Sequence, residues 1–554
     1  MSTEQPTGPR AEPPKALVDL HGRSPWSILP PLCLGFFMIM LDTTIVNVAV
    51  PTLMKELQAD VTEVGWVNSA YLLTFAVLLL VTGRLGDKFG PRPVFISGLV
   101  LFTLTSLACG LAPNVEVLIF ARALQGVGGA LMTPQTMSMI TRVFPPMKRG
   151  AAMGVWGAVA GVATITGPVL GGLLVPIGWE WIFFVNIPVG IVAFVFALRN
   201  LPKLPTSDRT FDVVGVVLSI VGMFLFVFGL QEGSTYDWGT IWGPITVWTV
   251  IGAGVVLLAA FGLWQRHLGD DALMPLRLFH SRNFSLSNVA GWAVTFAMTG
   301  IFFPFTIFLQ VGLGLSPLRS ALVGLGGSLL SGVVAPFAGR LSDRVPGKWI
   351  VATGFAILVG VVFVLAELVS PGVEIWKLVV TMCFFGIGTG CLFSPLANLA
   401  TSGLDHRNAG AGAGAFNTNR QIGGVIGSAA VVALFTSRLG IEIPAAAQTA
   451  AQTLPEQVRE PFLQAFAHVD QEALAGGSSN AFPIPDGVPD SVAAQIQTAA
   501  LDAVHSGLAT AVGQTLLLTV AVLALGLVAA LAMHATRPHH HGAPAEALAA
   551  AAGH

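Results

Sequence analysis

Long apolar runs recur along the whole chain and constrain its fold more than any other feature. Val94–Leu111 and Leu516–Met533 are examples, and each is long enough to cross a hydrocarbon core about 30 Å thick as a helix. Only 10% of the residues are charged, whereas a soluble globular chain carries about 25%. The sequence therefore excludes a water-soluble globular fold and predicts an all-α polytopic membrane protein.

Hydropathy predicts fourteen membrane spans, so both termini are expected on one side of the membrane. Lys and Arg concentrate in the loops on that side, and the positive-inside rule places it in the cytoplasm. We therefore expect a multi-pass protein of the bacterial plasma membrane with both termini cytoplasmic. The opposite side receives only Lys55, Arg319, Lys377, Arg438 and Arg459. The spans are expected near 28–50, 64–83, 93–112, 115–140, 151–174, 180–199, 212–231, 243–264, 284–311, 317–339, 349–368, 374–400, 409–436 and 508–533.

A short loop sequence occurs twice. Gly83–Arg92 reads GRLGDKFGPR and Gly339–Lys348 reads GRLSDRVPGK, each after the second span of a six-span block. Duplicated halves related by an axis along the membrane normal can rock about a site between them. The expected parts are a disordered cytoplasmic tail at 1–25, an N-terminal six-helix bundle at 26–205, two inserted helices with linkers at 206–283, a C-terminal six-helix bundle at 284–533 and a cytoplasmic tail at 534–554.

One polar segment, residues 437–507, is expected to form a large external loop of no chemical role. Within it, Val458, Phe462 and Phe466 recur at helical spacing. This spacing predicts a short amphipathic helix that lies on the membrane surface.

The sequence lacks the signatures of an enzyme. It contains no phosphate-binding P-loop, no nucleophile motif and no cluster of metal ligands. The four cysteines lie in apolar runs without the spacing of a disulfide framework or metal site. We expect no catalytic residues, no metal, no cofactor and no nucleic-acid partner.

Asp42 and Arg122 are two of the charged residues inside the expected spans. Asp42 falls midway along the first span, where a carboxylate costs about 2.5–3.5 kcal/mol on insertion scales and is therefore expected to have a role. It can bind and release a proton, or form a structural ion pair. Arg122 lies in the fourth span, and its fixed charge favours the ionised carboxylate when the two are close. It can equally only fix its helix to a neighbour.

Other polar and aromatic side chains inside the spans suit the wall of a cavity for a bulky lipophilic compound. Arg420 can bind an anionic group or pair with an acid, and the remaining side chains can instead tie helices together. The expected cavity residues are Gln125, Gln135, Trp292, Phe296, Phe303, Gln310, Asn417 and Arg420.

Two further groups of residues are expected to act on conformation. Charged residues in and after the repeated loops are expected to form salt-bridged latches on the cytoplasmic side, because they lie at the water boundary. Small residues in the fifth span let helices approach closely, and a proline there bends the helix. The latch residues are Arg84, Asp87, Arg92, Asp343 and Arg344, and the small face contains Gly167, Pro168, Gly171 and Gly172.

Five motifs together carry a family resemblance. They are the loop Gly83–Arg92, Leu41–Pro51 (LDTTIVNVAVP), Arg122–Ala130 (RALQGVGGA), Gly167–Gly172 (GPVLGG) and Trp179–Gly190 (WEWIFFVNIPVG). In this combination the chain resembles the major facilitator superfamily, and within it the fourteen-span drug:proton antiporter family. One departure is Ala163, where the pattern has a glycine four residues before Gly167.

The resemblance implies a secondary active efflux transporter that exports lipophilic drug-like or natural-product compounds by proton antiport with alternating access. It implies a role for Asp42 in proton coupling, and a role for the small face of the fifth span in sealing the interface between the halves. The expected partners are a lipophilic small molecule, protons and membrane lipids, and a monomer is expected. Two alternatives stay open, a transporter of lipids or lipid precursors with the same fold and a membrane sensor that does not transport.

Overall fold

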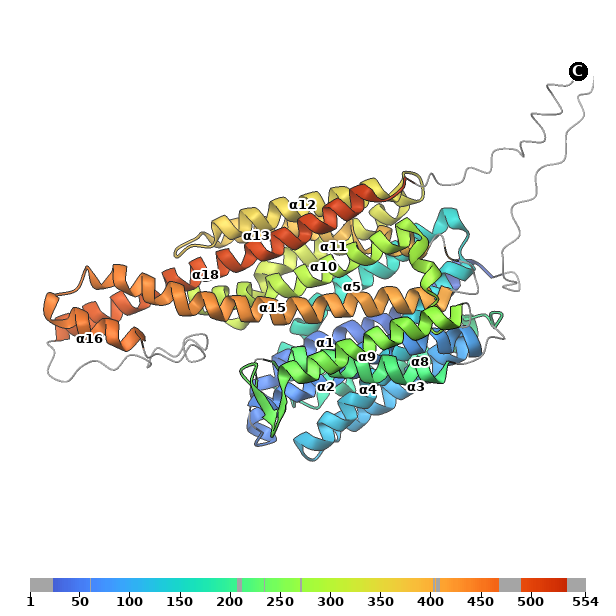
Figure 1. Cartoon of the computed structure of the whole chain (residues 1–554), viewed down its shortest axis with the longest axis horizontal. Coiled ribbons are helices and arrows are strands. Elements are labelled where there is room, and N and C mark those ends of the chain that lie inside the picture. The colour runs from blue at the N-terminus through green and yellow to red at the C-terminus, as the bar shows by residue number, and fades with distance from the viewer. Residues whose placement is uncertain are drawn as a thin grey trace, which may run out of the picture.

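The structure is a computed structural model that describes residues 23–59, 61–206, 212–233, 235–269, 272–401, 404, 409–467 and 490–535. Nearly all of this part of the chain is helical, and the helices run roughly side by side along one axis (Figure 1). The expected tails at 1–25 and 534–554 lie almost wholly outside the described residues.

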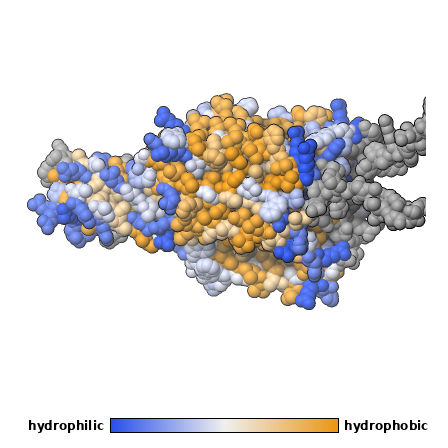
Figure 2. Space-filling view, turned by 90° about the horizontal axis from the view of Figure 1, so that it is seen from above, coloured by the Kyte–Doolittle hydropathy of each residue, from blue (hydrophilic) through white to orange (hydrophobic). Residues whose placement is uncertain are grey.

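Fourteen helical stretches of the described chain are long and apolar enough to cross a membrane, which confirms the predicted number of spans. Hydrophobic residues form a belt over the middle of the molecule, and polar residues gather towards its ends (Figure 2). The first half contains α1 (Leu29–Glu56), α2 (Val61–Phe89), α3 (Pro91–Gly110), α4 (Val115–Val143), α5 (Pro146–Leu174), the short α6 (Trp181–Phe184) and α7 (Asn186–Asn200). The second half contains α10 (Arg282–Ile307) with the π turn η4 (Phe308–Gly312), α11 (Pro317–Ser342), α12 (Gly347–Leu368), α13 (Ile375–Gly390), α14 (Phe393–Thr401), α15 (Ala409–Ala451) and α18 (Asp490–Ala532).

The two ends of the bundle differ. α1 begins and α18 ends at one end, where Lys348 Nζ donates to the carbonyl of Leu531 at 3.2 Å. We call this the terminal end. The opposite end carries a small antiparallel hairpin of β1 (Thr240–Trp242) and β2 (Ile245–Thr246), and we call it the hairpin end.

The halves pack in equivalent ways. Within the first half α2 and α3 pack on α4, and α1 packs on α5; within the second half α11 packs on α13, and α10 packs on α15 and α18. Between the halves, α5 packs along α11 and α2 packs along α15. The second helix of each half therefore contacts the fifth helix of the other, as expected for duplicated halves.

The inserted helices, α8 (Val213–Gln231) and α9 (Val247–Leu268), pack on each other, and α8 also contacts α2 and α15. Asp212 joins the pair at the terminal end. Its carboxylate accepts hydrogen bonds from the backbone N–H of Gly215 (2.7 Å), the indole of Trp264 (2.9 Å) and the amide of Gln265 (2.7 Å). The insert thus lies beside one of the two contacts between the halves.

The segment expected as an external loop, 437–507, is largely helical in its described parts. α15 and α18 have 43 residues each, so at about 1.5 Å per residue each is roughly twice as long as a hydrocarbon core is thick. The segment is rich in alanine, which favours helix, but its frequent glutamine, glutamate and proline residues lower its hydropathy, and this explains why hydropathy alone marked it as a loop. Residues 437–467 and 490–507 form a helical projection beyond the bundle at the hairpin end (Figure 1).

The short helix expected around Val458 is present as α16 (Glu456–Ala467). Its apolar face does not lie free for the membrane surface, because Phe462 and Phe466 are buried and α16 packs on α15. The position expected for this helix was therefore wrong, since the extended helices offer its aromatic side chains a protein surface.

Glycines allow the close helix packing inside the first half, and Gly128 on α4 is a clear case. A Cβ atom at this position would lie 2.7 Å from the backbone nitrogen of Phe102 on α3. We expect Gly128→Ala to lower the melting temperature of the purified protein, by an amount equivalent to about 1–3 kcal/mol of overpacking. The matched control is Gly252→Ala, at an exposed position of α9 where a Cβ atom would meet nothing within 4 Å. Equal melting temperatures for the two variants would contradict the packing argument.

Candidate functional site

A buried carboxylate lies at the centre of the first half. Asp42, on α1, has no exposed surface. It forms an ion pair with the guanidinium of Arg122 from α4. It also accepts hydrogen bonds from the amides of Gln125 on α4 (2.9 Å) and Asn186 on α7 (3.4 Å). The structure thus brings together the two charged residues that the sequence singled out.

Arg122 also contacts groups other than the Asp42 carboxylate. Its Nε donates to the carbonyl of Val67 on α2 at 3.1 Å, and its guanidinium lies 4.3 Å from the centre of the Tyr71 ring. Its Nη1 also donates to Gln125 Oε1 at 2.7 Å. The charge cluster, which we define as Asp42, Arg122, Gln125 and Asn186, therefore joins α1, α2, α4 and α7.

The chemistry of such a pair depends on its surroundings. When both groups are ionised the pair is neutral overall, and the neighbouring amides satisfy the remaining carboxylate lone pairs. Removing one charge of a buried pair typically costs about 3–5 kcal/mol, because the other charge is left without compensation. A proton that binds Asp42 would therefore strongly destabilise this arrangement of the first half.

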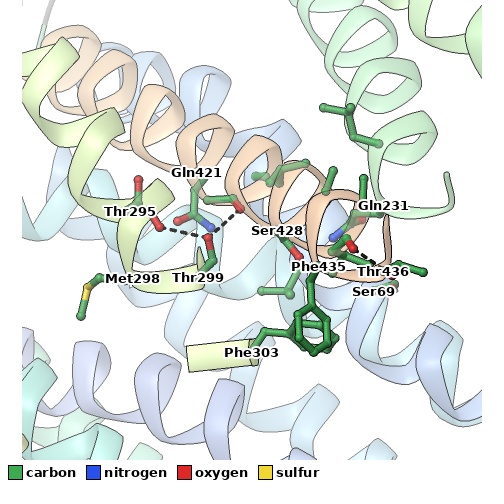
Figure 3. Close-up of a pocket in the computed structure, with 18 of the residues that line it drawn as sticks. Ser69, Gln231, Thr295, Met298, Thr299, Phe303, Gln421, Ser428, Phe435 and Thr436 are labelled. Atoms are coloured by element: carbon green, nitrogen blue, oxygen red, sulfur yellow. Dashed lines mark hydrogen bonds between the residues drawn. The ribbon is translucent and has the colours of Figure 1, made fainter. Parts of the chain in front are cut away.

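A cavity of about 980 Å³ lies between the halves, in the middle and hairpin parts of the bundle. Its walls come from α1, α2, α10 and α15, with the end of α8 and the following loop at its edge. Figure 3 labels the polar side chains of Ser69, Gln231, Thr295, Thr299, Gln421, Ser428 and Thr436 among its lining residues. The rings of Phe303 and Phe435 meet edge to face with centroids 5.9 Å apart. The cavity is therefore mostly apolar with a few hydroxyl and amide groups, as suits a lipophilic molecule.

Of the expected cavity residues, the structure places Phe303 in this wall. Gln125 belongs instead to the charge cluster, and Gln135 donates to the carbonyl of Thr82 at 2.7 Å, which ties α4 to α2. Trp292 and Phe296 pack on each other with centroids 5.3 Å apart.

The other three expected residues also lie outside this wall. Gln310 is in the π turn η4, and Asn417 donates to the carbonyl of Ala413 at 2.8 Å. Arg420 lies 5.3 Å from the Phe393 ring centre and 5.9 Å from that of Phe416.

Sequence reasoning missed the hydroxyl and amide groups of the wall. Gln421, Val425, Ser428 and Val432 lie on one face of α15 and recur every three or four residues. That spacing indicates a common helix face. Small and uncharged side chains recur in the same way where helices simply pack together, so the pattern does not identify a cavity wall.

Two carboxylates close the terminal end in equivalent ways. Asp87, near the end of α2, accepts hydrogen bonds from the backbone N–H groups of Gly410 (3.0 Å) and Ala411 (2.9 Å) at the start of α15. Asp343, just after α11, accepts them from Gly150 (2.8 Å) and Ala151 (2.9 Å) in the first turns of α5. The amino end of a helix attracts a negative charge, so each carboxylate binds the other half. We call these contacts the terminal seal.

The Asp343 carboxyl of the terminal seal is partly shielded from water. Burial raises the pKa of the Asp343 carboxyl to about 6, although its two backbone hydrogen bonds act in the opposite direction. The backbones meet closely beside it, because a Cβ atom on Gly339 of α11 would collide with the carbonyl oxygen of Gly150.

The other expected latch residues take different places. Arg142 on α4, which the sequence analysis did not single out, forms the ion pair with Asp87. Arg84 is buried and adds a nearby positive charge, whereas Arg344 is exposed. Arg92 donates to the carbonyl of Leu198 at 2.7 Å, within its own half. The only signal for Arg142 was its position at the charged end of the fourth span.

The small face of α5 serves two contacts. A Cβ atom on Gly167 or Gly171 would meet α1 of the same half, at Thr44 and Val48 respectively, and one on Gly172 would meet nothing within 4 Å. Pro168 lies inside the helix. The contact with α11 uses glycines nearer the terminal end, namely Gly150, Gly154 and Gly161.

Among the described residues no three His, Cys, Asp or Glu side chains are grouped to hold a metal ion.

Comparisons with known proteins agree on the family. Residues 32–428 match the model of the Major Facilitator Superfamily. An uncharacterized MFS-type transporter of Mycobacterium tuberculosis is 44% identical over 80% of this chain and 78% of its own length. The tetracenomycin C resistance and export protein of Streptomyces glaucescens is 34% identical over 80% of this chain and 82% of its own length.

A third relative and a solved structure extend the comparison. A methylenomycin A resistance protein of Streptomyces coelicolor is 32% identical over 72% of this chain and 83% of its own length. The crystal structure of the human organic anion transporter MFSD10 shares the fold, with a TM-score of 0.55 and 13% identity over 90% of this chain and all of that one. With fourteen spans, duplicated halves and a cavity between them, this chain belongs to the Major Facilitator Superfamily and is a multi-pass membrane transporter.

Proposed function

We propose that the protein exports lipophilic, drug-like compounds across the plasma membrane in exchange for protons. The observation that carries the proposal is the fully buried Asp42–Arg122 pair beside the wall of the cavity. Thr43, the next residue on α1, lines that cavity, whereas Asp42 is enclosed in the first half. The relatives named for antibiotic resistance and export support the direction of transport and the kind of substrate.

In this proposal the terminal end faces the cytoplasm, as the distribution of Lys and Arg supports. The seal closes that end, and the cavity lies towards the hairpin end. The described conformation is then the one whose cavity exchanges substrate with the outside. The opposite conformation opens when the seal separates and the halves rock.

α2 is the mechanical link between proton binding and the seal. Near its hairpin end, Val67 and Tyr71 contact Arg122. At its other end Asp87 binds α15. About 16 residues, or roughly 24 Å of helix, separate Tyr71 from Asp87. A proton on Asp42 frees Arg122 to move, and a movement of Arg122 shifts the helix that carries half of the seal.

We expect Asp42→Asn to reduce pH-gradient-driven efflux from proteoliposomes to the level of protein-free liposomes. The amide keeps the shape and the hydrogen-bonding capacity of the site but cannot exchange a proton. The measurement is the initial rate of dye efflux under an imposed pH gradient. The matched control is Asp502→Asn, at an exposed position of the helical projection, which we expect to pump like the original protein. Undiminished pumping by Asp42→Asn would contradict the assignment.

We also expect Asp343→Ala to loosen the terminal seal, because it removes the acceptor for both backbone N–H groups at the start of α5. The reporter is Ser394→Cys in a protein without its four native cysteines. Ser394 is buried and its hydroxyl donates to the carbonyl of Gly150 at 3.1 Å. A membrane-impermeant maleimide is expected to label this cysteine several-fold faster after Asp343→Ala. The control is Glu374→Ala at the exposed hairpin end, and equal labelling rates in the two variants would contradict the role of Asp343.

A further inference from the structure

One charged side chain lines the described wall of the cavity, and it comes from the insert. Asp237 lies in the loop between α8 and β1, at the hairpin end of the bundle. It is exposed, and among the described residues no cation forms an ion pair with it. Its negative charge is therefore available to a ligand at the edge of the cavity.

The backbone of this loop has an unusual conformation. Asp237 and the following residue, Trp238, both have a positive φ, of 47° and 56°. In the described chain Gln58 is the only other non-glycine residue with a positive φ. This conformation is unfavourable for a residue with a Cβ atom, and most of all for a bulky side chain such as that of tryptophan. Such backbone persists where its surroundings hold it, and it is concentrated at sites that bind ligands.

A hydrogen bond and ring packing hold the loop in this conformation. The backbone N–H of Trp238 donates to the carbonyl of Gly233 at 2.7 Å. The Trp238 ring stacks on the ring of Trp248 from α9, with centroids 5.4 Å apart. It also lies close against Gly233, where a Cβ atom would come within 2.8 Å of the ring. The insert therefore presents the Asp237 carboxylate from a fixed backbone.

The two neighbouring side chains favour the same kind of ligand. Trp238 lines the cavity together with Asp237. The face of an indole ring attracts a cation more strongly than the ring of tyrosine or phenylalanine does, and a carboxylate attracts a cation by its charge. A protonated amine or a quaternary ammonium group satisfies both side chains at once.

The depth of the cavity suits a different chemical group. Its polar side chains there, which include Thr295, Gln421 and Ser428, are uncharged (Figure 3). Met298 and Phe303 give it an apolar surface. A ligand that matches the whole cavity therefore has a positive charge at one end and an aromatic or aliphatic body at the other.

We propose that Asp237 and Trp238 form a binding site for the protonated amine or quaternary ammonium group of an aromatic organic cation. The apolar body of that cation then lies in the cavity against Met298 and Phe303. The insert thus takes part in the selection of substrates, although it lies outside the duplicated halves. The proposal rests on the proposed export function, because it names the class of compound that the same cavity carries.

The test compares two probes with one scaffold. Diphenylhexatriene is neutral, and its trimethylammonium derivative carries a permanent positive charge. Binding of each probe to the purified full-length protein is measured by equilibrium dialysis, with the same detergent concentration on both sides of the dialysis membrane. The excess of probe on the protein side is then the bound probe. We expect the original protein to prefer the cation by about fivefold, as suits an exposed carboxylate and one indole ring.

The variants assign that preference to the loop. Asp237→Asn is expected to lose most of it while binding of the neutral probe is retained. Asparagine tolerates a positive φ as aspartate does, so retained binding shows that the loop and the cavity are intact. The matched control, Glu374→Gln, removes an exposed carboxylate at the same end but outside the cavity wall, and it should bind both probes like the original protein. A preference that is unchanged in Asp237→Asn, or absent from the original protein, would overturn the proposal.

Two further arms separate the remaining interpretations. Dioleoylphosphatidylcholine added to the micelles displaces the cationic probe if the site binds the ammonium group of a lipid, and that displacement would overturn a soluble aromatic substrate. Asp42→Asn is expected to keep the cation preference, because no gradient drives the dialysis. If Asp42→Asn keeps both the preference and its pumping, proton coupling is contradicted and the cation site stands. If efflux depends on Asp42 but the original protein shows no cation preference, the cation site is contradicted and proton coupling stands.

Discussion

The ion pair between Asp42 and Arg122 is the interaction on which the first half depends. It lies where four helices meet, and it is closed off from both the cavity and the lipid. A neutral pair is tolerated there because the Gln125 amide donates to the carboxylate and the Val67 carbonyl accepts from Arg122 Nε. A half-neutralised pair is not tolerated, since an arginine without a counter-charge in such a site is strongly destabilising. In the proposed mechanism, this asymmetry is what lets a single proton on Asp42 favour another packing.

A change at the Asp42–Arg122 pair must also reach the terminal end of the molecule, where the seal lies. The terminal seal is built twice, each time from a carboxylate at the end of the second helix of one half and the amino end of the fifth helix of the other. Glycines at these crossings bring the backbones together, so the halves interlock tightly. One of the two carboxylates, Asp87, belongs to the helix that also contacts Arg122. The charge cluster, the cavity wall and the terminal seal are therefore built from the same few helices.

Much of this architecture could be predicted from the sequence. Apolar runs and charge placement predicted the spans, and the repeated loop predicted the two halves, because both signals are periodic along the chain. The rarity of charge inside spans singled out Asp42 and Arg122, whereas their direct ion pair was only one of the arrangements that the sequence left open. The partner of Asp87 could not be predicted, since Arg84 and Arg142 are both basic residues at the same end and only tertiary packing chooses between them. The helical projection was missed because its polar side chains give it the hydropathy of a loop, although its alanines favour helix.

The central claim is that protonation of Asp42 opens the terminal end. It is tested most directly by distances between spin labels at Phe89 on α2 and Leu341 on α11, two exposed positions at that end of different halves. The distances are measured in lipid nanodiscs by electron–electron double resonance as the pH is lowered from about 8 to about 5, a range in which a buried carboxyl can titrate. We expect a second, longer distance to gain population in the original protein and no such gain in Asp42→Asn. The same gain in both proteins would contradict the account.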